Sequence, residues 1–470
     1  MQTQWEDELR LYGDNERVPT ATLGSGAKYL IVVSIVAGFA ARGGDLVSLP
    51  FLERMGATAA VRGSPIYTTA EEIESTRCST TKRTPRILMM VRESLSHPAV
   101  LEILQELIRT PSVNPSISPD EAHGEEPIAK VAQNWLTANG VNSWLEEAAV
   151  GRPNVVAEVG GGKGPTLVFC AHLDTVGTKG MTIPPFEPRV VGNRVYGRGS
   201  YDMKGSAAAI LSAATALGHD DFSGRVLVAL VADEEYASIG AQDFVKHHLA
   251  DACVLTEPSE GRLILGHKGF VWAEIVTTGH AAHGSRWDLG VSAIAKMGRI
   301  ICALEDFDQV ELRSRVHPLV GSASLHCSLI KGGSGLSTYA EECRLKVERR
   351  TLPGELPHRV IQEIQEVIRS TGEGAKVYCL LDRPPLDCDR ESKIATCLRE
   401  AASSATGETP EEGGVGYWMD AALFHAAGIP TVNYGPGGAG AHEAVEWVDL
   451  DSVVSCARVL AETARRFCNS

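Results

Sequence analysis

The chain has 470 residues, with 44 Lys and Arg against 59 Asp and Glu, which gives a formal net charge of −15 at pH 7. An acidic balance of this size provides no general attraction to DNA, RNA or an anionic membrane, so we expect neither nucleic acid nor membrane as a partner. Hydrophobic residues form 44 % of the chain and charged residues 22 %, which is typical of a soluble globular protein and excludes a disordered chain.

The cysteines argue for a reducing compartment. There are 11 of them, scattered between Cys78 and Cys468 with no CxxC pair, which is not the pattern of a disulfide framework. The most apolar run, residues 29–41, is too short to span a membrane. It follows an acidic stretch and precedes no clear cleavage site, which argues against the alternative of a signal peptide. We therefore expect the protein to be cytoplasmic.

Residues 1–88 differ from the rest of the chain, because they combine mixed charge, one apolar run and a Thr/Ser/Arg-rich stretch without sustained periodicity. We interpret them as an N-terminal extension of unknown role. Met89 and Met90 stand directly before the first recognisable helix. This position suggests the hypothesis that translation begins there and that the extension is not part of the native protein.

From Pro98 onward, short apolar strands alternate with amphipathic helices, which favours an α/β sheet with helices on its faces. The glycine-rich segment 160–166 lacks the spacing of a phosphate-binding loop and precedes a strand, so we interpret it as a hairpin turn. The predicted helices are 98–108, 127–139, 203–217 and 239–249, and the predicted strands are 141–147, 154–159, 166–174, 225–233 and 253–258.

The order of elements changes after Lys268. A strand, a helix, two strands, a helix and a strand follow one another, which is the βαββαβ order of a ferredoxin-like unit. The α/β alternation then resumes and ends in an amphipathic helix. We therefore expect a catalytic domain in two parts, residues 95–267 and 381–470, with residues 268–380 inserted as a separate domain. The elements of the insert are expected at 268–278, 291–306, 322–331, 343–350, 358–370 and 375–381, and those after it at 420–429, 430–435 and 449–467.

Five segments place histidines and carboxylates at strand ends or in loops, where α/β sheets bind their ligands. Imidazole and carboxylate oxygen without thiolate suit Zn²⁺ or a similar divalent ion. Each segment alone would be read as a helix cap, a solvated turn or a buried polar residue, and the combination is what favours a metal site. The residues are His172, Asp174, Asp202, Glu234, Glu235, Glu257 and His442.

In this order, the motifs HLDT, GRGSYDMKG, DEE, TEPS and a glycine-rich loop with His resemble those of the co-catalytic dizinc amidohydrolases. That family includes acetylornithine deacetylase, succinyl-diaminopimelate desuccinylase, aminoacylase and glutamate carboxypeptidase. The resemblance covers roughly residues 95–468. It implies a mixed-sheet, zinc-exopeptidase-like catalytic domain with an inserted ferredoxin-like domain that serves dimerisation or acts as a lid.

The resemblance also implies a ligand set for two Zn²⁺ per subunit, with Co²⁺ as a substitute. Asp202 would bridge the two ions, His172 and Glu257 would complete one site, and Glu235 and His442 would complete the other. Two metal ions about 3.5–4 Å apart lower the pKa of a bridging water and stabilise a tetrahedral intermediate.

Two further carboxylates receive roles from the same resemblance. Asp174 would orient the imidazole of His172 from behind. Glu234 would act as the general base on the bridging water and pass its proton to the leaving amine.

The inserted domain contributes three candidates by resemblance. His283 would reach across a homodimer to the partner's active site, whereas His280 is interpreted as a surface or structural residue. Arg350 would bind a substrate carboxylate through its guanidinium fork, and a strand-end salt bridge is the alternative for it. Ser337 stands where relatives often carry a substrate-binding Asn, so the identity of the substrate is the property that this departure affects.

The expected function is metal-dependent hydrolysis of an amide bond in a small N-acyl amino acid, carried out by a homodimer. A di- or carboxypeptidase of the same family is the alternative. A non-catalytic binding homologue is disfavoured, because the ligands and the general base are all present.

Overall fold

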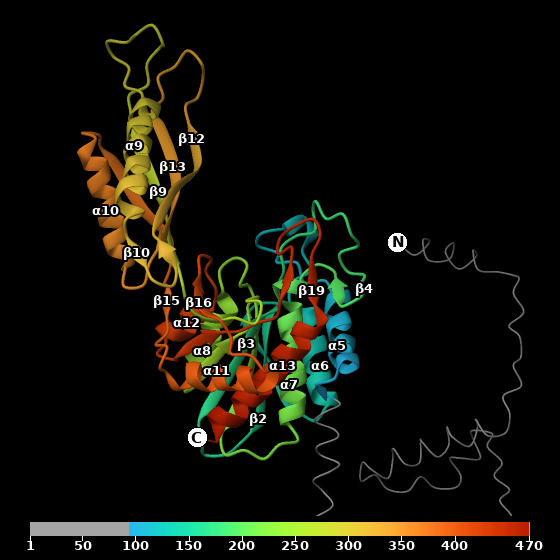
Figure 1. Ribbon diagram of the computed structural model, residues 1–470. Coiled ribbons are helices and arrows are strands. Elements are labelled where there is room, and N and C mark those ends of the chain that lie inside the picture. The colour runs from blue at the N-terminus through green and yellow to red at the C-terminus, as the bar shows by residue number, and fades with distance from the viewer. Residues whose placement is uncertain (1–93, 470) are drawn as a thin grey trace, which may run out of the picture. The chain divides into compact units, whose positions relative to one another are not determined.

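The computed structural model describes residues 94–469 (Figure 1). The predicted extension 1–88, its apolar run and the hypothesis about Met89 and Met90 lie outside the described residues. Within these residues no helix combines the length and apolarity that crossing a membrane requires.

The catalytic region is built on a nine-stranded mixed sheet with the order β1-β2-β6-β3-β7-β17-β8-β15, in which β16 also pairs with β8. Its four central strands, β6, β3, β7 and β17, run parallel, and β1 and β2 extend it in antiparallel fashion. The bounds are β1 (Asn142–Ala149), β2 (Arg152–Gly160), β3 (Thr166–His172), β6 (Arg225–Val231), β7 (Ala252–Leu255), β8 (Leu263–His267), β15 (Leu386–Asp387), β16 (Glu412–Val415) and β17 (Thr431–Asn433).

Helices cover this sheet, and α13 packs against both α7 and α11 in front of it in the view of Figure 1. Every residue of α7 is buried, because its run of Ala, Gly and Ser is small enough to fit between the sheet and its neighbouring helices. The bounds are α5 (His97–Arg109), η2 (Pro119–Glu121), α6 (Glu126–Ala138), η3 (Ser200–Lys204), α7 (Gly205–Leu217), α8 (Ile239–His247), α11 (Lys393–Thr406), α12 (Ala421–Ala426) and α13 (Leu450–Cys468).

Local sequence signals explain where these helices begin. Proline occupies the first turn of α5 and α6, where no backbone donor is needed. The side chains of Ser392 and Asp449 accept hydrogen bonds from the first turns of α11 and α13. The amphipathic pattern of α5 buries Val100, Ile103, Leu104, Leu107 and Ile108 on one face.

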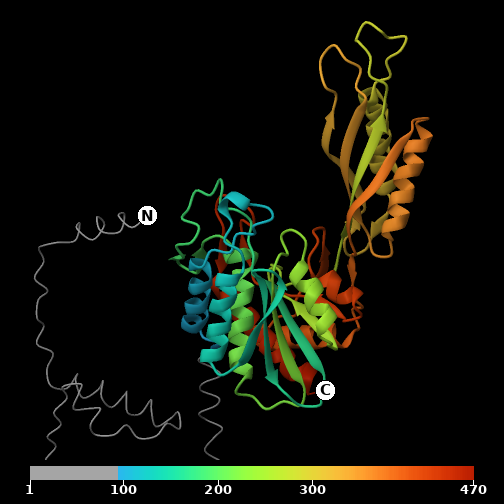
Figure 2. The same ribbon diagram turned by 180° about the vertical axis from the view of Figure 1, so that it is seen from behind.

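The inserted region forms a separate antiparallel sheet with the order β12-β13-β9-β14. Helices α9 and α10 pack on it, as Figure 2 shows from the other side. The helices and the sheet share a second hydrophobic core. The bounds are β9 (Gly269–Thr278), α9 (Ala293–Phe307), η4 (Asp308–Leu312), β10 (Val316–His317), β11 (Gly321–Ser322), β12 (Ser324–Gly332), β13 (Glu342–Thr351), α10 (Pro357–Ser370) and β14 (Ala375–Arg383). The order and pairing of these elements confirm the predicted α/β fold class with a ferredoxin-like insert.

A small four-stranded sheet, which the sequence does not predict, contacts the turn η3 that precedes α7. Its strands are too short to show a hydrophobic period. They are β4 (Arg189–Val191), β5 (Arg194–Tyr196), β18 (Gly438–Ala439) and β19 (Trp447–Asp449).

The prediction of a hairpin turn at residues 160–166 is wrong. Strand β6 lies between β2 and β3, so that Gly160 and Thr166 both pair with Arg225, one from each side. The segment therefore crosses over a strand instead of closing a hairpin. Glycines indicate that a chain turns there, but they do not indicate which strands become neighbours.

Candidate metal centre and substrate pocket

Three neighbouring parallel strands deliver four of the predicted site residues to one edge of the main sheet. His172 is the last residue of β3, and Glu257 follows β7, which pairs with β3 on one side. Glu234 and Glu235 follow β6, which pairs with β3 on the other side. Because carboxyl ends of adjacent parallel strands meet at one edge, these side chains converge although they are far apart in sequence.

Of the five candidate ligands, Asp202 and His442 come from turns instead of strand ends. Asp202 lies in the turn η3, directly before the buried helix α7. His442 lies in the connection between β18 and β19 and has a positive φ of 62°. The preceding Gly440 also has a positive φ, and a Cβ atom there would lie 1.9 Å from the carbonyl oxygen of Val445. Glycine at this position therefore allows the loop to carry His442 toward the sheet edge.

The side chains form two groups that share Asp202. His172 Nε2 lies 3.1 Å from Asp202 Oδ1 and 3.5 Å from Glu257 Oε1. His442 Nε2 lies 3.3 Å from Asp202 Oδ2 and 3.1 Å from Glu235 Oε1. In each group, the three candidate ligand atoms lie within 4.8 Å of one another. The structure thus brings together the five predicted ligands, and the carboxylate of Asp202 stands between the two groups.

The tautomer of His172 suits metal binding. Its Nδ1 donates a hydrogen bond to the main-chain carbonyl oxygen of Asp174, at 2.9 Å. This bond leaves the lone pair of Nε2 directed at Asp202 and Glu257. The prediction that the carboxylate of Asp174 orients the ring needs correction, because that carboxylate lies 3.7 Å from Nδ1 while the carbonyl oxygen of the same residue makes the bond.

The carboxylate of Asp174 instead holds the turn that carries the two glutamates. It accepts hydrogen bonds from the backbone N–H groups of Glu234 and Glu235, both at 3.1 Å. The side chain of Asn114 donates to it at 2.7 Å and also to Asp233 at 3.0 Å. Sequence reasoning missed Asn114, which lies in a loop about 60 residues before its partner and carries no local signal of this contact.

A second buried carboxylate holds the turn of Asp202. Glu446 Oε1 accepts the backbone N–H groups of Tyr201 at 2.9 Å and Asp202 at 3.0 Å. Its Oε2 accepts the N–H of Gly199 at 2.9 Å and a bond from Arg198 at 2.6 Å. Glu446 follows His442 by four residues, so the loop that provides one ligand also fixes the backbone of another. Sequence reasoning missed this residue as well, because a carboxylate in a loop has many possible partners.

The charges of the site favour a bound cation. Burial would raise the pKa of Asp202, but the imidazoles of His172 and His442 beside its two oxygens outweigh burial and lower that pKa. Hydrogen bonds with Asp202 and Glu235 raise the pKa of His442 to about 10. The raised pKa of His442 expresses a negative field that stabilises positive charge, and the lowered pKa of Asp202 keeps its carboxylate ionised, as a metal ligand must be. Two imidazoles and several carboxylates in this field match the N and O donor sets of Zn²⁺ sites, so the residues present fit a pair of such ions.

Glu234 stands beside these groups but belongs to neither. Burial, followed by the nearby charge of Glu257, raises its pKa well above the ordinary value of a carboxyl. A carboxylate with a raised pKa accepts a proton more readily than an exposed one, which is the property a general base requires.

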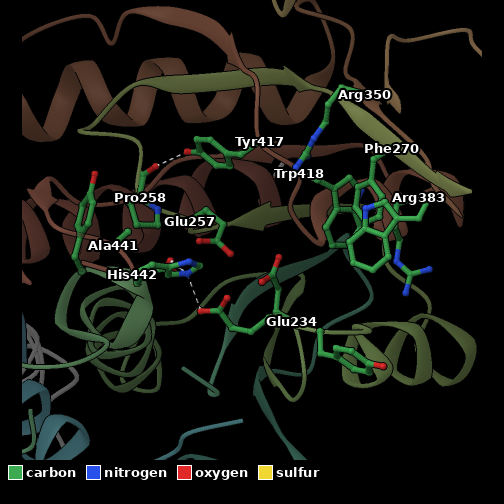
Figure 3. Close-up of a pocket in the computed structure, with 15 residues that line it drawn as sticks. Glu234, Glu257, Pro258, Phe270, Arg350, Arg383, Tyr417, Trp418, Ala441 and His442 are labelled. Atoms are coloured by element: carbon green, nitrogen blue, oxygen red, sulfur yellow. Dashed lines mark hydrogen bonds and ion pairs between the residues drawn. The ribbon is translucent and has the colours of Figure 1, made fainter. Parts of the chain in front are cut away.

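Four of the five candidate ligands line a pocket of about 460 Å³ (Figure 3), whereas His172 is buried and does not reach its surface. Glu234, Glu257 and His442 point into its centre in this view, whereas Arg350, Phe270, Trp418 and Arg383 form a cluster at one side. Sequence reasoning missed the aromatic residues and Arg383, because they meet only when the inserted sheet and the loop at Trp418 are folded. The remaining lining residues are Tyr201, Asp202, Glu235, Tyr236, Pro258, Trp272, Tyr417 and Ala441.

Arg350 lines the pocket as expected, whereas the neighbouring Arg349 does not. Its Nε donates to Glu348 Oε1 at 2.7 Å, and its guanidinium carbon lies 5.4 Å from the centre of the Phe270 ring. Arg349 is fully buried on the opposite side of the strand and pairs with Glu355 at 2.6 Å. Arg350 therefore makes the salt bridge considered as its alternative and still faces the pocket.

His283 and Ser337 lie outside the pocket of their own chain. Both are exposed, and they belong to two adjoining loops of the inserted region. The N–H of Gly284 donates to the carbonyl oxygen of Ser337 at 2.7 Å, and His283 Nδ1 lies 2.8 Å from Ser285 Oγ. His280 is exposed too, as predicted for a surface residue. In this structure neither His283 nor Ser337 contributes to the pocket of its own chain.

Comparison with known proteins agrees with this geometry. A full-length relative, the acetylornithine deacetylase of Vibrio cholerae, is 28 % identical over 385 residues, which cover 79 % of this chain and 99 % of that protein. The structure of an aminopeptidase from Bacillus cereus matches with a TM-score of 0.67 at 18 % identity, covering 80 % of this chain and 99 % of that one. A dinuclear metal-binding peptidase from Bacillus subtilis matches with a TM-score of 0.60 at 19 % identity, covering 78 % and 97 %. At these identities the two structures support the fold alone.

The family comparison covers the site itself. The family model described as Peptidase family M20/M25/M40 matches residues 168–466, a range that contains all five candidate ligands together with Glu234 and Arg350. This match spans more than half of the chain. The chain is therefore a metal-dependent amidohydrolase or metallopeptidase that belongs to Peptidase family M20/M25/M40.

Proposed function

We propose that this protein hydrolyses the amide bond of a small N-acyl amino acid and uses two Zn²⁺ ions per subunit, with Co²⁺ as a substitute. The observation that carries this proposal is the pair of ligand groups that share Asp202, with Glu234 beside them but outside both. His172, Asp202 and Glu257 would hold one ion, and Asp202, Glu235 and His442 the other. Such ions lower the pKa of a bound water and polarise the carbonyl that it attacks.

The protein's own groups account for the remaining steps. Glu234 takes a proton from the attacking water and delivers it to the nitrogen of the leaving amine. Asp174 keeps Glu234 and Glu235 in place through their backbone N–H groups, and Glu446 does the same for Asp202. Buried hydrogen bonds of this kind keep the reacting groups oriented before the substrate arrives.

Arg350 would bind the carboxylate of the amino acid. The hydrogen bond of its Nε to Glu348 fixes the guanidinium at the pocket wall and leaves both Nη groups for a ligand. A guanidinium fork pairs with a carboxylate through two parallel hydrogen bonds, which orients the substrate as well as holding it.

The second candidate function is a di- or carboxypeptidase, which the names of several structural neighbours suggest. Both activities break a carbon–nitrogen bond beside the same metal centre, so they differ in the group on the acyl side. A panel of N-acetyl, N-succinyl and dipeptide substrates separates them by the relative values of kcat/KM.

We also propose that the protein acts as a homodimer through the inserted region. Strand β12 lies at the edge of its sheet and exposes Leu329 and Ile330, at 66 % and 57 % of their surface. An apolar edge strand of this kind readily pairs with another chain. The loops of His283 and Ser337 lie in the same region, and a dimer would allow them to reach a partner's pocket. We place the protein in the cytoplasm, since the ten described cysteines form no disulfide.

Metal removal tests the proposed function. Dialysis against a chelator should abolish amidase activity on N-acetyl amino acids, and addition of Zn²⁺ or Co²⁺ should restore it. Circular dichroism before and after dialysis serves as the control for folding. Full turnover by protein shown to be metal-free would contradict the proposal.

A further inference from the structure

Two arginines and one phenylalanine stand side by side across the inserted sheet. Arg350 of β13 and Arg383 of β14 are both paired with Phe270 of β9, one from each side. Side chains that lie directly opposite each other in antiparallel strands point to the same face. Since neighbouring strands are about 4.8 Å apart, the backbones of the two arginines are separated by about 10 Å. All three side chains line the pocket, on the side opposite His442 in Figure 3.

Arg383 is a positive charge without a carboxylate bonded to it. Its Nη2 donates to the carbonyl oxygen of Ala237 at 2.7 Å, and its Nη1 to that of Asp382 at 3.0 Å. No ion pair joins it to a carboxylate within residues 94–469, in contrast to Arg350 with Glu348. Its guanidinium carbon lies 5.7 Å from the centre of the Trp418 ring. A guanidinium has five N–H donors, so three remain for a ligand in this half-buried position.

The charges around the pocket are segregated. Its four acidic lining residues, Asp202, Glu234, Glu235 and Glu257, all belong to the metal centre and its base. Away from that centre, the charged lining residues are the two arginines, and the wall between them is aromatic. A cationic substrate side chain would find no acidic partner there, whereas a second anionic group would meet the unpaired guanidinium of Arg383.

We infer that Arg383 is a specificity-determining residue which binds a second carboxylate, so that the preferred substrate is an N-acyl amino acid with two negative charges. The inference rests on the proposed function. Arg350 receives the α-carboxylate, and Arg383 receives a carboxylate of either the acyl group or the amino-acid side chain. N-acetylornithine, with its cationic side chain, is then a poor substrate, although the relative from Vibrio cholerae reported above is an acetylornithine deacetylase.

A purely structural role for Arg383 makes a different prediction. The hydrogen bond to Ala237 ties the end of β14 to the turn that carries Glu234 and Glu235. If this tie were the whole function of Arg383, its loss would disturb the general base and lower kcat equally for every substrate. If Arg383 instead binds a carboxylate of the substrate, its loss raises KM and Kd for dianionic ligands, while KM and Kd for monoanionic ligands hardly change.

The first experiment measures binding, independently of turnover. Zinc-loaded Glu234→Gln protein is titrated calorimetrically with N-acetylglutamate and N-acetylglutamine, and with N-succinylleucine and its amide N-succinamoylleucine. Each pair differs in one charge and hardly in shape. The inference predicts that, in one pair, the member with two carboxylates binds about 10- to 100-fold more tightly than the member with one. The pair that shows this difference identifies which end of the substrate carries the second carboxylate. Equal affinity within both pairs overturns the inference.

The second experiment assigns the preference to the residue. Arg383→Gln should abolish the charge preference, Arg383→Lys should retain part of it, and Arg359→Gln should leave it intact, because Arg359 is exposed on α10 outside the pocket. An unchanged preference in Arg383→Gln, or an equal loss for all ligands, overturns the assignment. The Lys variant and the wild-type comparison keep the test valid if the Gln variant does not fold. Failure of the proposed function would appear separately, as zinc-loaded wild type that hydrolyses none of these amides.

Discussion

The two ends of the pocket are built on different principles. At the metal end, the ligands come from strand ends and turns whose backbone N–H groups are held by the buried carboxylates of Asp174 and Glu446. At the other end, Arg350, Phe270 and Arg383 are side chains on one face of a sheet, with few bonds to fix them. The reaction therefore depends on backbone geometry that tolerates little change, whereas substrate choice depends on side chains that can be exchanged one at a time.

The largest effect is expected from the general base. Glu234→Gln keeps the shape of the side chain but removes its ability to take a proton, so kcat should fall by about 10²- to 10⁴-fold. Bound zinc, measured by atomic absorption, should stay at the wild-type level, because Glu234 belongs to neither ligand group. A variant that works near the wild-type rate would place the base elsewhere.

The carboxylate of Glu446, which holds the turn of Asp202, should matter nearly as much at the metal end. Glu446→Gln turns an amide NH₂ toward backbone N–H donors and leaves the buried Arg198 without its carboxylate partner. We expect zinc affinity to fall by about 10- to 100-fold, as measured by chelator competition, with a matching loss of activity at limiting zinc. Glu443→Gln is the matched control, since the side chain of Glu443 is exposed in the same loop. Equal zinc affinities for the Glu446 and Glu443 variants would show that Glu446 does not support the metal centre.

At the other end, replacement should change binding and spare the chemical step. Arg350→Lys keeps the charge but loses the fork, so KM should rise about tenfold while kcat stays within a few-fold of the wild type. Steady-state kinetics with one N-acetyl amino acid measure both values. A loss confined to kcat would mean that this wall takes part in the reaction itself, which would contradict the contrast between the two ends.

The smallest signal comes from subunit mixing. Neither His283→Ala nor Glu234→Gln protein should be active alone if His283 acts on its partner's pocket. In an equimolar mixture half of the dimers contain both variants, and each of these has one intact site, so about a quarter of the wild-type rate should return. Mass spectrometry of differently tagged subunits verifies that mixed dimers form, and verified dimers without activity would refute the shared site.

The sequence is informative about the metal end because its residues follow strand ends. Buried parallel strands have a recognisable apolar pattern, and the residues that follow them must meet at one edge of the sheet. His172, Glu235 and Glu257 were therefore predictable together. Asp202 and His442 were candidates from their loops, and the resemblance assigned the five residues to two metal positions. The ferredoxin-like insert was predictable from the order of its strands and helices.

The remaining features depend on pairings that no local pattern encodes. The role of Asp174 changed because its main-chain oxygen lies closer to the ring of His172 than its carboxylate does. Arg383 acquires its position through the register of β14 against β9, which includes a bulge between Cys379 and Leu381. A shift of one residue in that register would turn Arg383 to the opposite face, so its place in the pocket follows from tertiary pairing alone.

The edge position of β12 has a consequence for hydrogen exchange. In a single subunit β12 pairs with β13 on one side only, so about every second backbone amide between Ser324 and Gly332 points outward and exchanges quickly with solvent. When two subunits pair along this strand, the outward amides become protected as well. The exchange rates of these amides at rising protein concentration therefore report assembly directly, even in a subunit whose active site has been disabled.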